Sequence, residues 1–367
     1  MFAPKYLKNA RDVVKNVTRL LHYKRDLLRP EDFVRLTEKN QALADSIRQR
    51  DQGTVERLIG ELDGELGKVI PTQKFPGIRE NCETLLVAIV IALGIRAYFL
   101  QPFKIPTGSM QPTVNGVIAT PLSSPLPSLP QRFWEVVWNG RSYLEVVAKR
   151  DDTVAQLQAV PFLWFSVATQ IVTTSGLTYK IKCPPANLMN DLGVGPGTTL
   201  RAGQPIVRAR VQTGDQLFVD KFTYHFRKPV RGEVFVFTTQ EIPGILNDPR
   251  SNGLTQFYIK RLAAIPGDAV RIAHPDLFIN NEIAAEFGLK RVMSNQNGYR
   301  GFANIGPELL QSPLQTFDVP AARYLALGDN SYNSSDSRFW GTVPERSVVG
   351  RGFFVYWPFG QNFGIIR

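Results

Sequence analysis

The sequence predicts a mainly β domain behind one membrane-spanning helix, with a helical N-terminal extension and a β-rich insertion. Three observations lead to this prediction. Apolar residues recur at helical spacing over the first 79 residues, an uncharged apolar run follows, and short β-like runs separated by Gly, Pro, Asn and Asp then continue to the end. The expected parts are the extension at 1–79, the anchor at 80–103, a first segment of the β domain at 104–118, the insertion at 119–212 and the rest of the β domain at 213–367.

The composition is typical of a protein whose mass lies in folded soluble domains. Of 367 residues, 43% are hydrophobic and 20% are charged, which excludes a wholly disordered chain and a multi-span transporter. The formal net charge of +11 suits nucleic acid, an anionic membrane surface and acidic substrates equally well. Two cysteines, Cys82 and Cys183, are too few for a disulfide scaffold or a multi-cysteine zinc site.

The first 79 residues are predicted to form an amphipathic helical hairpin. Apolar positions follow a helical period around Val13 and Val17 and again around Val55 and Leu62. Positive charge exceeds negative charge here, but it is spread along the segment. This pattern favours solvated helix faces over an arm that binds lipid or nucleic acid.

The apolar run from Thr84 to Ile95 is predicted to be a membrane anchor. Its twelve residues alone span only about 18 Å of helix, but an extension to Phe103 reaches the roughly 30 Å of a hydrocarbon core. Arg96 would then extend toward the interface. A cleavable leader is not expected, because such a segment lies at the extreme N-terminus and this run begins after some eighty residues. Flanking positive charges nearly balance, so they leave the orientation open.

The stretch at 121–130 is rich in Pro and Ser and marks a loop, and the region from there to about 214 is predicted to be a separate β-rich insertion. Within it, the apolar run at 159–172 is short for a second span and contains Pro161, Ser166 and Gln170. We therefore predict a pair of buried strands there.

Two segments contain candidate catalytic residues. Ser109 lies among small turn-forming residues directly after the anchor, where a carbonyl could approach it, although a plain Gly-Pro loop would have the same composition. Lys260 lies among apolar neighbours in a strand-like run. A lysine on a strand normally points to solvent, but in a dry interior its pKa would fall and its neutral amine could take and return a proton.

A third segment, 327–341, is dense in short polar side chains and contains Asp336 and Arg338. Such a segment is often only an Asx-rich turn. It could also form ion pairs that hold the wall of a site beside a buried lysine.

These segments, in this order, resemble the membrane-bound type I signal peptidases, also called leader peptidases. The matching segments are 105–113 around Ser109, Lys260-Arg261 with 266–268, and 328–338, together with 214–222, 231–237 and the helix exit at Arg96 and 101–103. The resemblance implies that the β domain has the signal-peptidase-like β fold.

The resemblance also implies a role for each matching residue. Ser109 would be the nucleophile and Lys260 the general base. Ser334 would orient the lysine amine, and the Thr107 hydroxyl would join the Ser109 amide in an oxyanion hole. Met110 would line the catalytic cleft. The remaining matches would be structural ion-pair partners: Arg261, Asp329, Asp336 and Arg338.

The activity that this resemblance implies is removal of signal peptides from exported preproteins, after a small-x-small sequence, without a cofactor or metal. The extension would be cytosolic and the catalytic domain would lie on the outer or periplasmic face of a bacterial cytoplasmic membrane. Exported preproteins and the bilayer would be partners, the secretion translocon is a candidate partner, and no specific nucleic acid is expected. In this topology Cys82 and Cys183 lie on opposite sides of the membrane and could not pair.

Two features depart from the family pattern. Ser331 and Tyr332 stand where many members have Arg and Asp, and 119–212 has no counterpart in the minimal pattern. Two other interpretations stay open: a Ser/Lys peptidase with a narrow substrate set, and an inactive membrane-tethered scaffold of the same fold.

Overall fold

The computed structural model describes residues 4–69, 76–162, 166–247 and 255–367. Its chain divides within one long helix into two compact units, residues 1–89 and 90–367. Each unit has its own buried apolar residues.

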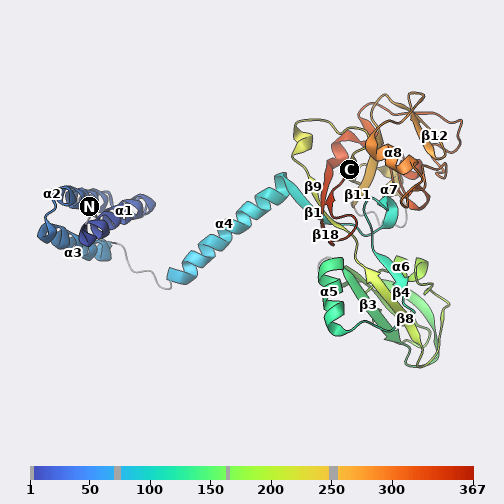
Figure 1. Ribbon diagram of the computed structural model, residues 1–367, viewed down its shortest axis with the longest axis horizontal. Helices are drawn as coiled ribbons and strands as arrows, with labels where there is room; N and C mark the ends of the chain where they lie inside the picture. The colour runs from blue at the N-terminus through green and yellow to red at the C-terminus, as the bar shows by residue number, and fades with distance from the viewer. Residues whose placement is uncertain (1–3, 70–75, 163–165, 248–254) are drawn as a thin grey trace. The chain divides into compact units, whose positions relative to one another are not determined.

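The N-terminal unit contains three packed helices, α1 (Lys5–Tyr23), α2 (Pro30–Gln49) and α3 (Gln52–Val69) (Figure 1). Leu36 and Leu43 of α2 are fully buried against the other two helices. The chain reverses after α2 at Arg50, whose φ of 60° is left-handed. The expected helical character is confirmed, but the expected hairpin is a three-helix bundle.

The apolar run forms part of α4 (Pro76–Tyr98). Residues Glu80–Tyr98 have a mean hydropathy of 1.5 and none of them is buried within the described protein, so this helix is long and apolar enough to cross a membrane. Helix α4 ends at Tyr98, and Leu100 begins a β-strand. The helix thus begins before the expected range of 80–103 and also ends before that range does, because the last residues of the range pair with a neighbouring strand instead.

The main β-sheet of the second unit is antiparallel, with strand order β1-β9-β18-β10-β11-β16-β17 and with β19 paired to β18 (Figure 1). Its bounds are β1 Leu100–Lys104, β9 Gln216–Asp220, β10 Val234–Thr238, β11 Phe257–Ala264, β16 Arg323–Leu327, β17 Val343–Pro344, β18 Val348–Trp357 and β19 Gly364–Ile365. The sheet joins a strand from just after α4 to strands from beyond residue 215. This confirms the expected mainly β domain.

A second, smaller sheet has the order β14-β13-β12-β15 and packs with α8 (Phe287–Met293) around a shared apolar core. Its strands are β12 Ala269–Ala273, β13 Asp276–Ile279, β14 Glu282–Ile283 and β15 Phe317–Asp318. The short helices α7 (Pro243–Leu246) and α9 (Ser337–Trp340) belong to the same part of the chain, and Ile245 of α7 and Trp340 of α9 share a second core with strands of the main sheet.

Residues 119–212 form two further sheets around their own apolar core, with strand orders β2-β8-β3 and β6-β5-β4-β7. The elements are β2 Ile118–Pro121, α5 Leu129–Asn139, β3 Arg141–Val147, β4 Asp152–Phe162, β5 Ser166–Thr173, β6 Thr178–Ile181, α6 Pro185–Asn190, β7 Thr199–Leu200 and β8 Pro205–Gln212. Strands β4 and β5 pair antiparallel across 159–172 as expected, although 163–165 lie outside the described residues. The expected burial is found in β5, where Ala168 and Ile171 are buried, but not in the β4 part of this run, where Ala159 is exposed.

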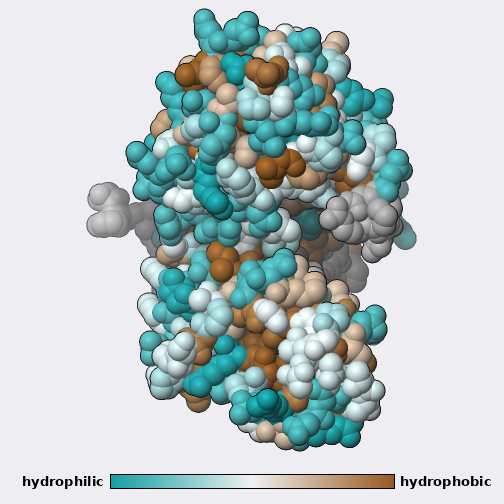
Figure 2. Space-filling view, turned by 90° about the vertical axis from the view of Figure 1, so that its right-hand side faces the viewer, coloured by the Kyte–Doolittle hydropathy of each residue, from teal (hydrophilic) through white to brown (hydrophobic). Residues whose placement is uncertain are grey.

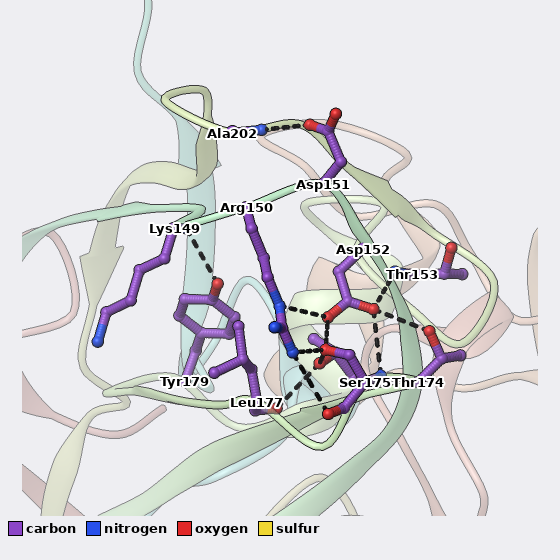
Figure 3. Close-up of polar contacts among 11 residues, drawn as sticks. Lys149, Arg150, Asp151, Asp152, Thr153, Thr174, Ser175, Leu177, Tyr179 and Ala202 are labelled. Carbon is purple, nitrogen blue, oxygen red and sulfur yellow. Dashed lines mark hydrogen bonds and ion pairs between the residues drawn. The ribbon is translucent and has the colours of Figure 1, made fainter.

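Asp152, at the start of β4, accepts hydrogen bonds from the turn that follows β5 (Figure 3). Its enclosed carboxylate accepts hydrogen bonds from the Thr174 hydroxyl and from the backbone amide and hydroxyl of Ser175, and it lies 3.8 Å from Arg150 Nε. The turn after β5 is thereby tied to the start of β4.

Candidate active site

The segment that contains Ser109, the expected nucleophile, leaves β1 and turns sharply into a short 3-10 helix, Gly108–Met110. Gly116 allows this turn, because a Cβ at that position would lie 2.2 Å from the Thr107 carbonyl carbon. Ser109 is held within the turn with only 7% of its surface exposed. Sequence and packing together therefore bury a serine hydroxyl at the end of the edge strand.

Strand β11 carries Lys260 to this hydroxyl. The Nζ atom of Lys260 lies 2.7 Å from Ser109 Oγ, and the lysine is 4% exposed. Burial lowers the pKa of Lys260 from 10.5 to about 8, although the nearby carboxylates of Asp336 and Asp329 raise it. The net effect is an amine that can lose its proton near the pH of a cell.

Two buried ion pairs lie beside the lysine. Arg261 Nη2 is 2.6 Å from Asp329, and Arg338 Nη2 is 2.7 Å from Asp336, with all four side chains fully buried. Asp336 also accepts the backbone amide of Gly328 at 2.9 Å. Each buried charge has a charged partner and further hydrogen bonds, which offsets its desolvation. All four residues were expected to be such ion-pair partners.

The three other predicted site residues have different surroundings. Thr107 is exposed directly before the nucleophile turn, whereas Met110 is fully buried in the core behind it. Ser334 Oγ is buried and makes no hydrogen bond to any described residue. A Cβ at Gly328 would lie 2.1 Å from this oxygen and 2.6 Å from the Ser109 carbonyl oxygen, which places Ser334 close to the nucleophile segment.

Residues without a predicted role complete the site. Thr113 donates to Asp329 through a short hydrogen bond and receives one from Arg261 at 3.2 Å. Asn330 donates to the carbonyl oxygens of Gly108 and Ser109, each at 3.1 Å. Both residues lie within the segments that match the family, but only the fold shows which residues they contact.

Ser331, which departs from the family pattern, contacts the ion pair of Arg338 with Asp336. Its hydroxyl and its carbonyl oxygen each accept from Arg338 at 2.8 Å. The hydroxyl at this position therefore satisfies one donor of the arginine, and the backbone carbonyl oxygen of the same residue satisfies a second.

A hydroxyl in contact with a buried amine of lowered pKa is an arrangement suited to acyl transfer. The amine can remove the hydroxyl proton while the oxygen attacks a carbonyl. In the described residues, no group of three or more His, Cys, Asp and Glu side chains is arranged to hold a metal ion.

Comparisons with known proteins identify the family of this chain. The sequence profile of the family described as "Signal peptidase, peptidase S26" matches residues 207–357. The probable signal peptidase I-2 of Synechocystis sp. is 30% identical over 193 residues, which are 49% of this chain and 78% of that protein. Signal peptidase I of Pseudomonas aeruginosa is 30% identical over 192 residues, which are 41% of this chain and 62% of that protein.

A plant protein is also similar. The thylakoidal processing peptidase 1 of Arabidopsis thaliana is 31% identical over 147 residues, 40% of this chain and 37% of its own length. Relatives therefore include bacterial and chloroplast proteins. Since the chain spans more than two thirds of a signal peptidase with which it shares 30% of aligned residues, it belongs to the type I signal peptidases of the peptidase S26 family and is a serine peptidase.

Proposed function

We propose that this chain removes N-terminal signal peptides from exported preproteins, with Ser109 as nucleophile and Lys260 as general base. The observation that supports this assignment best is the 2.7 Å separation of Lys260 Nζ from Ser109 Oγ in a buried position. A lysine with a pKa of about 8 has a substantial neutral fraction near neutral pH, whereas an exposed lysine has almost none.

In the first half of the reaction, neutral Lys260 takes the proton of Ser109 as Oγ attacks the carbonyl carbon of the scissile bond. The resulting ammonium then protonates the departing amine, which is the new N-terminus of the mature protein. Water, deprotonated by the same amine, hydrolyses the acyl-enzyme and restores Ser109. One side chain thus serves as base and acid in turn.

The negative oxygen of the tetrahedral intermediate needs hydrogen-bond donors. The exposed hydroxyl of Thr107 and the backbone amide of Ser109 are the proposed pair, two residues apart in the same turn. Ser334 would turn its unpaired hydroxyl to the Lys260 amine when substrate is bound, since a buried hydroxyl without a partner gains from such a bond.

The proposed substrate is an extended peptide. Strand β1 ends the main sheet, and β11 pairs with β16 only from Arg261 onward, so within the described strands both have a free edge near Ser109. A peptide can add to such edges through its backbone. Because alternate side chains of an extended peptide face the same side, two tight apolar contacts would select small residues separated by one other residue.

The proposed location follows from α4. A spanning helix that ends at Tyr98 would leave β1 beside the bilayer, where a signal peptide emerges. We propose the cytoplasmic membrane of a bacterium, with residues 1–79 cytosolic and the β domain outside. A reporter fused after Arg367 should be active only outside the cytoplasm, and cytosolic activity would contradict this topology.

The decisive experiment incubates the detergent-solubilised protein with a preprotein that has a small-x-small site and reads the new N-terminus by mass spectrometry. Cleavage is expected with the wild type and with Ser123→Ala, which alters an exposed serine outside the site, but not with Ser109→Ala. Cleavage by Ser109→Ala would exclude Ser109 as the nucleophile. Failure of the folded wild type would favour the narrow-substrate peptidase or the inactive scaffold.

A further inference from the structure

The N-terminal bundle has its excess positive charge on one helix. Helix α1 contains five Lys and Arg residues and one acidic residue, Asp12, whereas α3 contains two Lys and Arg residues and four acidic residues. Helix α2 contains three basic and four acidic residues. The excess that is spread along the sequence of 1–79 is therefore concentrated on α1 in the folded bundle.

Four of these cations share one face of α1. They follow one another at intervals of three or four residues: Lys8, Arg11, Lys15 and Arg19. Helical residues at this spacing lie above one another in a stripe. All four are exposed, and none forms an ion pair within the described part of the chain. The buried side of α1, with Ala10 and Val17, faces the bundle core, so this basic stripe faces solvent.

A groove of about 360 Å³ lies beside the basic stripe. Arg11 and Lys15 of α1 line it together with Arg48 of α2, and the described lining contains no Asp or Glu. Arg48 is highly exposed and pairs with Asp45 at 3.3 Å. The rest of the lining is apolar: Val14, Ala44 and Ile47. Two arginines and a lysine around one groove suit a phosphate group, which accepts several charge-assisted hydrogen bonds.

The connection to α4 favours a phosphate that belongs to a lipid. Only six residues, 70–75, separate α3 from α4. So short a segment reaches about 25 Å at most, which keeps the bundle close to a bilayer that α4 crosses. Clusters of Lys and Arg beside a spanning helix bind anionic lipids. The basic stripe contains no aromatic side chain on which a base could stack, so it suits RNA less well.

The contact would be electrostatic. Large apolar side chains are exposed at few positions of the described bundle, 4–69, namely Tyr23, Leu27 and Val34. On the second unit, by contrast, apolar residues gather on part of the surface (Figure 2). A surface that is basic and mostly polar binds headgroups without entering the hydrocarbon, and salt weakens such binding.

We infer that the basic stripe of α1 and the groove beside it bind the phosphate headgroups of anionic phospholipids in the leaflet that the bundle faces. The inference goes beyond the proposed function and depends on α4 as a membrane-spanning helix. Binding would hold the bundle against the leaflet without a contact to the reacting atoms at Ser109.

The test measures contact between bundle and lipid in the full chain, reconstituted as single copies in nanodiscs. A fluorophore is attached at His22→Cys, three residues beyond Arg19 on the same face, in a chain with Cys82→Ser. The remaining cysteine, Cys183, is buried. Lipids with a nitroxide on the headgroup quench the fluorophore at short range. Quenching should be strong in discs with phosphatidylglycerol, weak in discs of phosphatidylcholine alone, and weaker in both at high salt.

Two matched variants test which cations are responsible. Arg11→Gln/Lys15→Gln should lower the ratio of lipid-bound to free bundle about thirtyfold in anionic discs, since each cation near an anionic surface contributes about fivefold. Arg57→Gln/Lys68→Gln also removes two exposed cations, but from α3 and outside the groove. This control should change the ratio by about twofold at most, because salt screens charges that lie away from the lipid.

The outcomes separate this inference from the proposed function. Equal quenching in both lipids, or quenching that survives in the α1 double variant, would overturn the inference. Binding of an RNA oligomer, or pairing of two copies, would also overturn it if the α1 double variant abolishes that binding and anionic lipid has no effect. Both double variants should cleave a preprotein like the wild type. Absent cleavage together with lipid-dependent quenching would overturn only the proposed reaction.

Discussion

Asn330 holds Ser109 in place through the backbone. Its own amide N–H donates to the Ser109 carbonyl oxygen at 3.1 Å, and its side-chain Nδ2 donates to the Gly108 carbonyl oxygen at 3.1 Å. Two successive peptide units of the nucleophile turn are therefore tied to the segment that follows β16. Asn330 thus contacts the backbone around Ser109 without touching the serine hydroxyl.

Replacing Asn330 with Ala should lower kcat about tenfold, with a smaller change in KM, because it frees one of the two tied carbonyls. The free energy of unfolding should fall by about 1 kcal/mol for the lost hydrogen bond. Steady-state kinetics and urea unfolding would measure both. An unchanged kcat with reduced stability would show that the contact serves folding alone.

The pH dependence of kcat/KM should reflect Lys260. Its pKa is lowered to about 8 by burial, and only the neutral amine can accept the serine proton. Activity should therefore fall about tenfold per pH unit below about pH 7 and level off above about pH 8 to 9. Lys260→Arg should be inactive throughout, since arginine keeps its proton. Substantial activity of this variant would contradict the assignment.

The same burial should make Lys260 destabilising. A pKa lowered from 10.5 to about 8 corresponds to about 3 kcal/mol against the charged form. Below about pH 8 this penalty is fully present, and it disappears as pH rises to 10.5, because the unfolded lysine then also loses its proton. Lys260→Met should therefore be inactive yet more stable by about 2 kcal/mol at pH 7, with a smaller gain at pH 10. Equal gains at both pH values would show that charge burial is not the cause.

Gly328 should tolerate no side chain. A Cβ there would meet Ser334 Oγ at 2.1 Å and the Ser109 carbonyl oxygen at 2.6 Å. Gly328→Ala should push the nucleophile turn away from Lys260 and reduce kcat/KM at least a hundredfold. Gly60→Ala is the matched control, because nothing lies within 4 Å of its Cβ position in α3, and it should raise stability by up to about 1 kcal/mol without affecting cleavage. Activity of Gly328→Ala near that of the wild type would show that the turn can shift without harm.

The sequence alone predicted the pair that meets at the centre of the site, because Ser109 and Lys260 each lie in a motif typical of one family of peptidases. It also predicted a β domain after an apolar helix. Contacts such as those of Asn330 and Thr113 were not predicted, since they depend on how segments more than two hundred residues apart pack together. The donors and acceptors of such a residue do not by themselves identify its hydrogen-bond partner.

Two boundaries differed from the predictions for physical reasons. Helical periodicity in 1–79 indicated helices but did not show how many there are. The middle helix is identified by its packing, because Leu36 and Leu43 are buried against the other two helices. Residues Leu100–Phe103 were expected to belong to the anchor, but Pro102 cannot donate a helical hydrogen bond and disfavours a helix there. They form a strand because β9 offers backbone partners, from Leu100 with Asp220 to Phe103 with Leu217.

Asp152 should determine how the 119–212 region responds to acid. Hydrogen bonds lower the pKa of the Asp152 carboxyl, and the bond from the Ser175 hydroxyl has the largest effect. Its contribution to stability is therefore present above about pH 4, the unfolded pKa, and is lost as pH falls further, because the unfolded chain takes up the proton first.

Asp152→Asn should make the turn at 174–175 more open to proteases at pH 7, because an amide cannot accept all the bonds that the carboxylate accepts. Limited proteolysis with mass spectrometry would locate the cuts. Asp151→Asn is the matched control, since the carboxylate of the exposed Asp151 accepts from the Ala202 amide at 2.7 Å, away from that turn (Figure 3). Equal protection of both variants would mean that the apolar core of the region, with Ile171 and Ile181 buried in it, suffices to hold this turn.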